Sequence, residues 1–439
     1  MNDLDTLHIG IDDTDSAKGM CTTFLAYKIA CMLKRQNVEF LDFPGLVRFN
    51  PNIPWKTRGN GAVSLKIRTQ NTDKARESTL NMVEKYSDVK NGANPGLVFF
   101  EGNTIPDELS QFSDLALWQL VCRAKARHLA ARHGLDFFCQ GNGQGLVGAI
   151  GAIGYSFNDH TLELLSYRKR SNFGKKRPIS AKSVKIMHEK TSPGTFGSFD
   201  ADKHKVLIAP HGPDPVFCGI RGEDSDSVLC ASRMLKMDER LDGYMIFKSN
   251  QGTGDHLRHT LAPDQMRPYW SGMLVGVVMD KPEITRGGHV FFTVSVKGGK
   301  FRCAVYRPTG MSYVALGLVP GDKICIGGGI RKASKNHPRV FNAELIRILD
   351  ICKPLVWSNP VCKDCSKSMK SKGVGQGYQC VRCKKRSYWR QASPLLRTIK
   401  RKLYLPTVSA HRHLTRPMQR TRKNRKSEFG NSIPWICEY

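Results

Sequence analysis

The hydrophobic pattern at the start of the chain predicts a strand and a helix separated by an acidic turn. Apolar residues alternate with smaller or polar ones from Leu7 to Ile11, which is the period of a short buried strand. Over residues 24–36 the apolar positions recur at helical spacing, and Thr22 and Thr23 in front of them are suitable helix caps. The turn between the two elements carries three carboxylates within four residues, those of Asp12, Asp13 and Asp15.

Three neighbouring carboxylates at a strand end repel one another unless a cation neutralises them. Oxygen ligands grouped in this way suit magnesium, which commonly also holds substrate phosphates. The hydroxyl-rich start of the following helix is in turn a favourable place for a phosphate group. The acidic turn is therefore either a metal and phosphate site or an ordinary solvated turn whose aspartates cap the backbone.

A second unit is predicted between residues 95 and 167. Its elements are strands at 97–100, 136–139 and 161–167, a long helix over 112–133 and a glycine-rich segment at 140–148. That segment contains a literal G-x-G-x-x-G, but the element after it is only about ten residues long. The motif is therefore weak evidence for a dinucleotide site, although its loop could cradle a phosphate or ribose. The order strand, helix, strand, helix, strand suits a ferredoxin-like unit.

A loop ahead of the predicted strand at 63–67 carries cations beside glycine. Two prolines exclude a helix there, and Gly59, Asn60 and Gly61 suit a tight turn. Lys56 and Arg58 could hold phosphates, with backbone amides completing the cradle. The alternative is an ordinary hairpin turn with two surface cations.

A similar loop cluster lies further along, among a strand at 206–209, a helix at 226–235 and a strand at 244–247. Arg221 and Gly222 stand just ahead of that helix and could hold an anion. The alternative is a pair of turns whose polar residues bond their own backbone.

The C-terminal third predicts a small β-barrel followed by a metal site. Five short strands, at 274–278, 290–296, 302–306, 323–326 and 341–348, are typical of an OB fold, which often binds single-stranded nucleic acid. Two C-x-x-C pairs then follow, Cys362 with Cys365 and Cys380 with Cys383. This spacing is a strong signal for a structural zinc ion held by four thiolates, which leaves no open position for catalysis.

The charge of the chain indicates a polyanionic partner, most simply nucleic acid. It has 68 Lys and Arg against 38 Asp and Glu, a formal net charge of +30. Between residues 366 and 427 basic residues alternate with aromatic ones and no acidic residue occurs. This run is either a solvated tail or an RNA-binding segment that orders on binding. The residues proposed to contact nucleic acid are Arg331, Lys384, Lys385, Tyr388, Trp389, His411, Arg412 and His413.

Membrane association is not expected, because no run of about eighteen apolar residues occurs and no lipidation motif is present. The acidic N-terminus lacks an apolar signal core, so we expect a cytoplasmic protein whose scattered cysteines are reduced.

Several of these motifs, taken in order, closely resemble those of the archaeal tRNA(Ile) 2-agmatinylcytidine synthetases. They are Ile11-Asp-Asp-Thr-Asp-Ser16, Gly19-Met-Cys-Thr-Thr23, Lys56-Thr-Arg-Gly-Asn-Gly61, Gly141-Asn-Gly-Gln-Gly-Leu-Val-Gly-Ala149, Pro210-His-Gly-Pro-Asp-Pro-Val216, Gly219-Ile-Arg-Gly222 and Asn250-Gln-Gly-Thr253. With the barrel and the cysteine pairs, the resemblance spans nearly the whole chain. It departs at Gln144, where the family pattern suggests arginine, and at Gly254, where it suggests an acidic residue.

The resemblance implies an ATP-dependent ligase that acts on the tRNA(Ile) with a CAU anticodon. The C2 carbonyl of the wobble cytidine is activated by phosphorylation, and the primary amine of agmatine replaces its oxygen, so that the anticodon reads AUA. The implied fold is an α+β multidomain chain. Its parts are a kinase-like domain (1–94 and 196–268), a ferredoxin-like domain (95–195), an OB-fold barrel (269–350), a zinc ribbon (354–390) and a basic tail (391–439).

The resemblance also implies roles for individual residues. Thr22 is the autophosphorylated residue, and Asp12, Asp13 and Asp15 hold magnesium or orient phosphate. The residues expected to bind ATP phosphates are Lys56, Arg58, Gly59, Asn60, Gly61, Gly141, Asn142, Gly143, Gly145, Arg221 and Gly222. Because agmatine carries a guanidinium, its pocket needs an anion, and Asp214, Glu223 and Asp255 are the candidates.

Two other functions remain open from the residues alone. A non-catalytic nucleic-acid binder would need only the barrel, the ribbon and the tail, so the acidic turn and the glycine turns speak against it. An ATP-dependent RNA ligase or kinase with another substrate would keep the acidic turn but show no dependence on an amine. The oligomeric state is left open.

Overall fold

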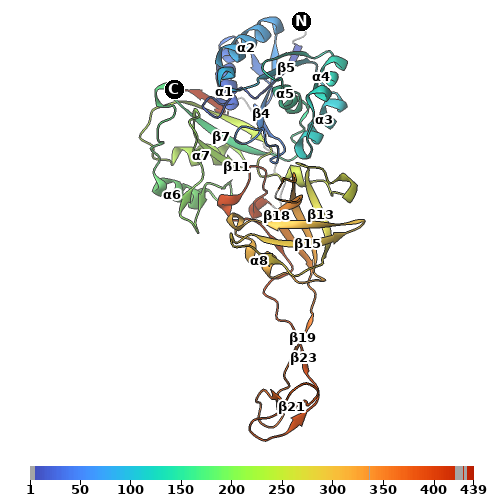
Figure 1. Ribbon diagram of the computed structural model, residues 1–439. Coiled ribbons are helices and arrows are strands. Elements are labelled where there is room, and N and C mark those ends of the chain that lie inside the picture. Colours follow the sequence, from blue (N-terminus) through green and yellow to red (C-terminus); the bar gives the residue numbers. More distant parts are fainter. Residues whose placement is uncertain (1–4, 336, 421–428, 430–432) are drawn as a thin grey trace.

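The computed structural model describes residues 5–335, 337–420, 429 and 433–439. Figure 1 shows a large mixed sheet with its helices, a β-barrel against one end of it, and a small unit held away from both on a two-stranded stalk. The chain is therefore an α+β protein of several domains. Among the described residues, no helix is long and apolar enough to span a membrane.

The large sheet has the strand order β6–β5–β1–β4–β3–β12–β7–β11–β8, with β2 paired to β4 and β25 to β12. Strands β3 and β12 pair in parallel and the other pairs are antiparallel. The strands are β1 Asp5–Asp12, β2 Glu39–Phe40, β3 Gly45–Arg48, β4 Gly61–Thr69, β5 Gly96–Glu101, β6 Asp136–Cys139, β7 Thr161–Arg168, β8 Thr195–Phe196, β11 Val216–Gly222, β12 Leu241–Ser249 and β25 Ile436–Glu438. A separate short pair is formed by β9 Phe199–Asp200 and β10 Lys205–Val206.

The helices cover both faces of this sheet (Figure 1). They are α1 Thr22–Arg35, α2 Thr72–Tyr86, α3 Asp107–Trp118, α4 Arg123–Arg132, α5 Gly145–Gly154, α6 Ala181–Thr191 and α7 Ser225–Arg233, and a short α8 Ser312–Leu316 belongs to the barrel.

Strand β1 is enclosed on both sides, which fixes the position of the acidic turn. Its alternating apolar residues Leu7, Ile9 and Ile11 are fully buried in one core with the apolar face of α1. On the opposite face α5 packs so closely that a Cβ on Gly10 would lie 2.1 Å from the carbonyl oxygen of Ala149. The chain that leaves β1 therefore emerges between the starts of α1 and α5.

Three local predictions were wrong. Thr22 is the first residue of α1 rather than its cap; the cap position is Cys21, which makes no capping hydrogen bond. The helix predicted over 112–133 is broken into α3 and α4, because the end of α3 packs on the barrel core while α4 packs beside α5. Of the strand predicted at 206–209, only Val206 is in a strand, as the second residue of β10; Pro210, four residues further on, has no backbone N–H with which to extend the pairing.

The five predicted C-terminal strands are all present and close into a barrel. They are β13 Ser271–Val278, β15 Val290–Val296, β16 Gly299–Val305, β17 Lys323–Arg331 and β18 Val340–Asp350, with β14 Glu283–Ile284 as a short addition to β15. The closing pair is β13 with β15. The barrel core is continuous with residues at the end of α3, so the barrel is packed against the large sheet.

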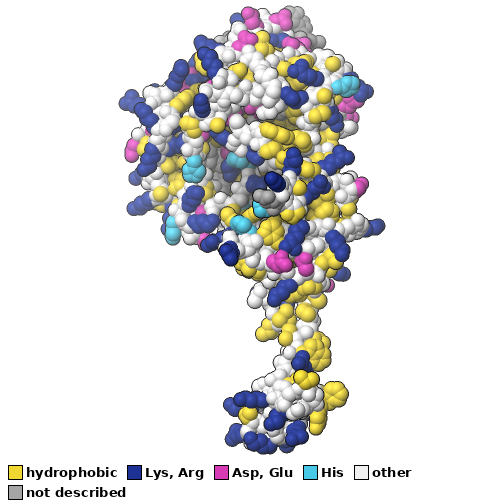
Figure 2. Space-filling model, viewed as in Figure 1, with side chains coloured by type: hydrophobic (Ala, Val, Ile, Leu, Met, Phe, Trp, Pro, Cys, Tyr) yellow, Lys and Arg dark blue, Asp and Glu magenta, His cyan; other side chains and the backbone are white. Residues whose placement is uncertain are grey.

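The four-cysteine unit projects from the barrel on a stalk of two antiparallel strands, β19 Leu355–Ser358 and β23 Gln391–Pro394 (Figure 1). The unit itself has three short strands, β20 Lys370–Ser371, β21 Tyr378–Gln379 and β22 Arg386–Ser387. Figure 2 shows Lys and Arg side chains gathered at its far end.

The residues that follow the stalk return to the body and do not form a solvated tail where they are described. Strand β24 Leu403–Tyr404 pairs with β18, and β25 pairs with β12. Arg420 is fully buried and forms ion pairs with Asp159, at 2.9 Å, and Glu223, at 2.6 Å. These partners neutralise the guanidinium, which explains how a basic segment can be packed inside the protein.

Candidate active site

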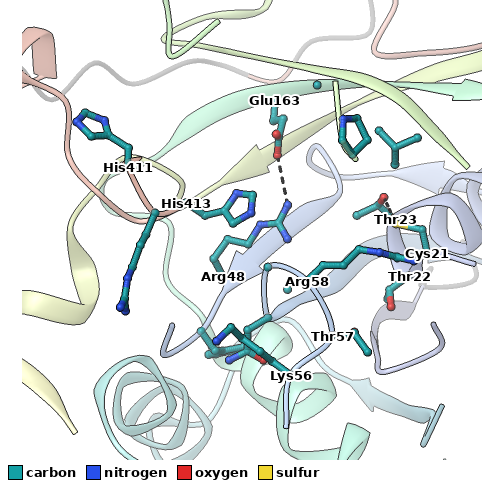
Figure 3. A pocket seen from close by; sticks show the side chains of 18 of the residues that line it. Cys21, Thr22, Thr23, Arg48, Lys56, Thr57, Arg58, Glu163, His411 and His413 are labelled. Atoms are coloured by element: carbon teal, nitrogen blue, oxygen red, sulfur yellow. Dashed lines mark hydrogen bonds and ion pairs between the residues drawn. The ribbon is translucent and has the colours of Figure 1, made fainter. Parts of the chain in front are cut away.

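A cavity of about 870 Å³ lies where the large sheet, the loop before β4 and the C-terminal segment meet. Figure 3 shows its side chains converging from these separate parts of the chain. Its lining includes half of the residues predicted from the sequence, namely Asp12, Asp13, Asp15, Thr22, Lys56, Arg58, Gly59, Asn60, Gly61, Asn142, Asp214, Arg221, His411, Arg412 and His413.

The acidic turn lies at one side of this cavity, with Asp15 buried and Asp12 and Asp13 half-buried. Asp12 lies under the first turn of α5, where a Cβ on Gly148 would come 1.9 Å from its Oδ2 atom, so only glycine fits there. Burial and the nearby charge of Asp13 raise the pKa of Asp12 well above its ordinary value. Burial also raises the pKa of Asp13 to about 6, against a lowering by the hydrogen bond that Gln144 donates at 2.9 Å.

The carboxylates of the turn have the charge and spacing that favour binding of a divalent cation. Burial raises the pKa of Asp15 as well, and the Asp15 charge raises those of Asp12 and Asp13, so the carboxylates are held together at an electrostatic cost that a cation would offset. Their ligand atoms do not converge into a site made of protein alone. This also suits magnesium, which usually takes one or two carboxylates and completes its shell with water and phosphates.

Thr22, the first residue of α1, faces the same turn. Its hydroxyl lies 3.4 Å from Oδ1 of Asp15 and accepts a hydrogen bond from the Thr14 hydroxyl at 3.1 Å. The first backbone amides of a helix have no partner within the helix and attract negative charge. A phosphate at Thr22 would therefore lie at a favourable helix terminus and beside the carboxylates.

The loop before β4 lines the cavity and carries the two cations Lys56 and Arg58. Arg58 donates to Oδ2 of Asp15 at 2.6 Å and to the carbonyl of Met20 at 2.8 Å. Lys56 is turned to its own loop, where its ammonium donates to the carbonyls of Pro51 and Ile53 at 2.6 and 3.1 Å. Backbone at Arg58 and Asn60 has positive φ, which fits the tight turn expected there.

A second charged group lies across the cavity, and the sequence patterns did not predict most of its residues as part of the site. The buried carboxylate of Glu163 lies between two guanidiniums, 3.7 Å from Arg48 and 3.3 Å from Arg221 (Figure 3 shows the Arg48 pair). Gln251 donates to the same carboxylate, and its carbonyl oxygen lies 2.8 Å from Nδ1 of His413. Nothing around Arg48 in the sequence distinguishes it, and Glu163 is marked only by its position twenty residues after Gly143 of the glycine motif.

Some predicted residues lie outside the lining. Gly141 and Gly143 have positive φ in the turn before α5, and Gly145 has no room for a side chain because the backbone of Asn94 and Gly96 lies against it. Gly222 likewise packs against Val228 at the end of β11. These glycines shape the backbone around the cavity and do not face it.

Of the three agmatine candidates, the cavity contains only Asp214. Its Oδ2 is buried without a hydrogen bond in the described structure, 3.8 Å from Nε of Arg58. Glu223 is paired with Arg420, and Asp255 accepts a hydrogen bond from Tyr155 and pairs with Arg258 at 2.5 Å. Asp214 also has a guanidinium partner, Arg177 at 3.5 Å, so what distinguishes it from the other two is its position in the cavity lining.

Neither departure from the family pattern disrupts the site. Gln144 bonds Asp13, as described above, and Gly254 has a φ of 75°, a backbone conformation that suits glycine better than an acidic residue.

The four predicted metal ligands do converge. The sulfur atoms of Cys362, Cys365, Cys380 and Cys383 all lie within 4.8 Å of one another, and no other group of three or more His, Cys, Asp or Glu ligands does so within the described residues. Four thiolates fit a closed zinc site. Around them Lys384, Tyr388 and Trp389 are exposed, as is Lys385, which pairs with Asp364. Arg331 is on the barrel, 3.4 Å from the Tyr306 hydroxyl.

A buried carboxylate turn that faces a helix start and several guanidiniums is suited to phosphoryl chemistry, and the barrel and the exposed basic ribbon suit a nucleic acid. Together they define an enzyme that modifies RNA with the use of a nucleoside triphosphate.

Comparison with known proteins gives the family. Models for the TiaS TCKD domain, the TiaS FLD domain and the TiaS C-terminal zinc ribbon domain match residues 8–76, 143–256 and 359–403. The isoleucine-tRNA 2-agmatinylcytidine synthetase TiaS of Cenarchaeum symbiosum is 48% identical over 430 residues, which cover 98% of this chain and 96% of that protein. The chain belongs to this family, the isoleucine-tRNA 2-agmatinylcytidine synthetases (TiaS).

Solved structures agree over the full length. The crystal structure of TiaS in complex with its isoleucine tRNA and ATP has a TM-score of 0.85 at 31% identity, covering 96% of this chain and 99% of that one. The complex of TiaS with the same tRNA, AMPCPP and agmatine has a TM-score of 0.82 at 30% identity with the same coverage. The resemblance found from sequence motifs is thus confirmed.

Proposed function

We propose that the cavity is the catalytic centre of an ATP-dependent ligase that converts the wobble cytidine of the CAU-anticodon tRNA(Ile) to 2-agmatinylcytidine. Phosphorylation of the C2 oxygen turns a poor leaving group into phosphate, and the primary amine of agmatine then displaces it. Membership of a synthetase family over nearly the whole chain supports this function over that of a non-catalytic nucleic-acid binder.

In this proposal the acidic turn and the helix start perform the phosphoryl transfer. Asp12, Asp13 and Asp15 would hold magnesium, which when bound would neutralise the phosphates of ATP. The ion pair with Arg58 favours the ionised form of Asp15 against the effect of burial, which raises its pKa, and Thr22 is the residue that accepts a phosphoryl group. Contacts to the ATP phosphates are assigned to the loop of Lys56–Gly61, to Arg221 and to the turn before α5, whose exposed Asn142 lines the cavity.

Agmatine is assigned to the side of the cavity at Asp214. A guanidinium needs an anion that faces the cavity, and Asp214 is the one of the three candidates that lines it, with an Oδ2 atom that accepts no hydrogen bond from the described residues. Glu223 and Asp255 are weaker candidates because they do not line the cavity.

The tRNA is assigned to the barrel, the ribbon and the C-terminal segment. We assign an OB fold to the barrel, a kinase-like and a ferredoxin-like domain to the large sheet, and zinc to the four cysteines. A cytoplasmic location stays a prediction. Exposed aromatic and basic residues on the ribbon, such as Tyr388, Trp389 and Lys384, suit RNA.

The observation that carries the proposal is the meeting of Thr22, Asp15 and Arg58 in one cavity. The test is transfer of labelled phosphate from γ-labelled ATP, and of labelled agmatine, to the wild-type chain and its tRNA. We expect both labels to be transferred by the wild type and neither by an Asp15→Asn variant. Agmatine transfer by Asp15→Asn at the wild-type rate would refute the role of the acidic turn.

A further inference from the structure

The C-terminal segment contributes an imidazole to the cavity, and the shorter of its two polar contacts favours one tautomer. The Gln251 amide donates its N–H to Glu163, so its carbonyl oxygen faces His413. The carbonyl can only accept, so this 2.8 Å contact requires the proton on Nδ1 of His413, whereas the Arg221 guanidinium, 3.3 Å from the same nitrogen, can only donate and would require the proton on Nε2. We take the shorter contact, with Gln251, to set the tautomer, which leaves the lone pair of the neutral ring on Nε2.

Nε2 of His413 faces Gly59, in the loop that carries Lys56 and Arg58. A Cβ built on Gly59 would lie 2.7 Å from Nε2 of His413, so any residue with a side chain would block it. Both Gly59 and His413 line the cavity, and Figure 3 shows the His413 ring beside Arg48 and next to this loop. The absence of a side chain at residue 59 leaves Nε2 open to a ligand.

The charges around His413 keep its ring neutral. The charged groups that face it are Arg48 from β3 and Arg221 from β11, with Glu163 from β7 bonded to both. Burial, and then the two guanidiniums, lower the pKa of His413 well below its ordinary value. The same guanidiniums disfavour an ammonium group in this part of the cavity, and so favour the neutral, nucleophilic form of an amine.

The proposed agmatine site lies on the other side of the same loop. Arg58 approaches Asp214 while the next residue, Gly59, faces His413. Agmatine with its guanidinium at Asp214 would thus extend its amine towards the imidazole.

We propose that His413 is a further catalytic residue, whose Nε2 accepts the proton that the agmatine amine loses as it attacks the activated cytidine. This inference rests on the proposed function. In the step, the amine nitrogen forms a bond to C2, and the bond between C2 and the phosphorylated oxygen breaks. The oxygen leaves with the bonding pair as inorganic phosphate, and one amine proton passes to Nε2. Gln251 and Glu163 are positioning residues that fix the tautomer.

The test separates activation of the tRNA from attack by the amine. Wild type and His413→Gln are compared by tRNA-dependent ATP consumption and by single-turnover incorporation of labelled agmatine. His128→Gln, on the exposed face of α4 and outside the cavity, is the matched control. General base catalysis contributes on the order of 100-fold or more, so incorporation should fall by about that factor while ATP consumption changes less than about threefold.

A second variant distinguishes catalysis from a structural role. His413→Ala leaves space beside Gly59, and added imidazole should restore incorporation in proportion to its unprotonated fraction as the pH is raised. Incorporation within about threefold of wild type for His413→Gln, an equal fall of ATP consumption, or no rescue by imidazole would overturn the role of His413. A wild-type chain that incorporates no agmatine would instead overturn the proposed function itself.

Discussion

The hydroxyl of Thr22 lies 3.4 Å from Oδ1 of Asp15, although the two residues belong to different elements. Asp15 is in the turn after β1, and Thr22 begins α1, so this contact joins a carboxylate turn to a helix N-terminus. Arg58 bonds the other oxygen of Asp15 at 2.6 Å. In the proposed function this arrangement would let one small region hold a phosphate, its counter-ion and an acceptor hydroxyl.

Removal of the Thr22 hydroxyl should abolish the modification without weakening tRNA binding. For Thr22→Ala we expect agmatine incorporation to fall on the order of 100-fold or more, since the acceptor group itself is lost. Affinity for the tRNA, measured by filter binding, should stay within about twofold, because Thr22 is buried in the cavity. Thr22→Ser keeps a hydroxyl and should retain incorporation; wild-type incorporation by Thr22→Ala would rule out the phosphothreonine role.

Neutralisation of Asp13 should stabilise the protein and inactivate it. Because burial raises the pKa of Asp13 to about 6, its ionisation lowers the free energy of unfolding as the pH rises from about 4 to above 6. Asp13→Asn should therefore increase that free energy by on the order of 2 kcal/mol at pH 7 without divalent cations, and by little near pH 4. Denaturant unfolding at the two pH values measures this. A gain that is absent at pH 7, or equal at both pH values, would contradict the electrostatic explanation.

Zinc and the ribbon should be needed for tRNA affinity but not for the cavity. Replacing residues 359–390 by a short glycine–serine turn keeps the paired stalk strands β19 and β23, and also the returning segment. We expect loss of bound zinc and at least about tenfold weaker tRNA binding, with ATP binding unchanged, since several basic contacts are removed together. Unchanged tRNA affinity would exclude the ribbon from the tRNA interface.

Truncation at residue 395 should have a different effect from loss of the ribbon. It leaves the ribbon in place and removes His411, Arg412 and His413, which line the cavity, together with the fully buried Arg420. We therefore expect ATP binding to fall together with tRNA binding. Calorimetric titration of the two shortened chains with ATP makes the comparison, and equal ATP affinities would show that the returning segment is dispensable for the nucleotide site.

Loss of the buried guanidinium of Arg420 should destabilise the whole chain. Arg420→Met leaves the carboxylates of Asp159 and Glu223 without this partner, which typically costs about 3–5 kcal/mol when an ion pair is broken on one side. Thermal unfolding should show a clear drop, whereas Arg401→Met at an exposed position should not change it. A restored melting temperature in the triple variant with Asp159→Asn and Glu223→Gln would confirm the cause.

The parts of the site that could be predicted from the sequence are those with a local physical signature. Alternating apolar residues marked β1, three adjacent carboxylates marked its end, and two C-x-x-C pairs marked the metal ligands. In each case the residues that act together are also close in sequence. The same is true of the five barrel strands, whose turns separate them clearly.

The parts that could not be predicted depend on contacts between distant segments. Arg48 and Glu163 meet only because β3 and β7 both flank β12 in the sheet. His413 enters the cavity because the chain returns from the ribbon, and nothing in a basic segment distinguishes a residue that will be buried from one that stays solvated. The break between α3 and α4 likewise follows from packing on two different cores.

The most direct test of the central claim is incorporation of labelled agmatine into a CAU-anticodon tRNA by the full chain, with and without ATP. The matched control is the same tRNA with uridine in place of the wobble cytidine. We predict incorporation that requires ATP, maps to the wobble position and is absent from the control tRNA. Tight binding of the tRNA with no incorporation, or incorporation without ATP, would contradict it.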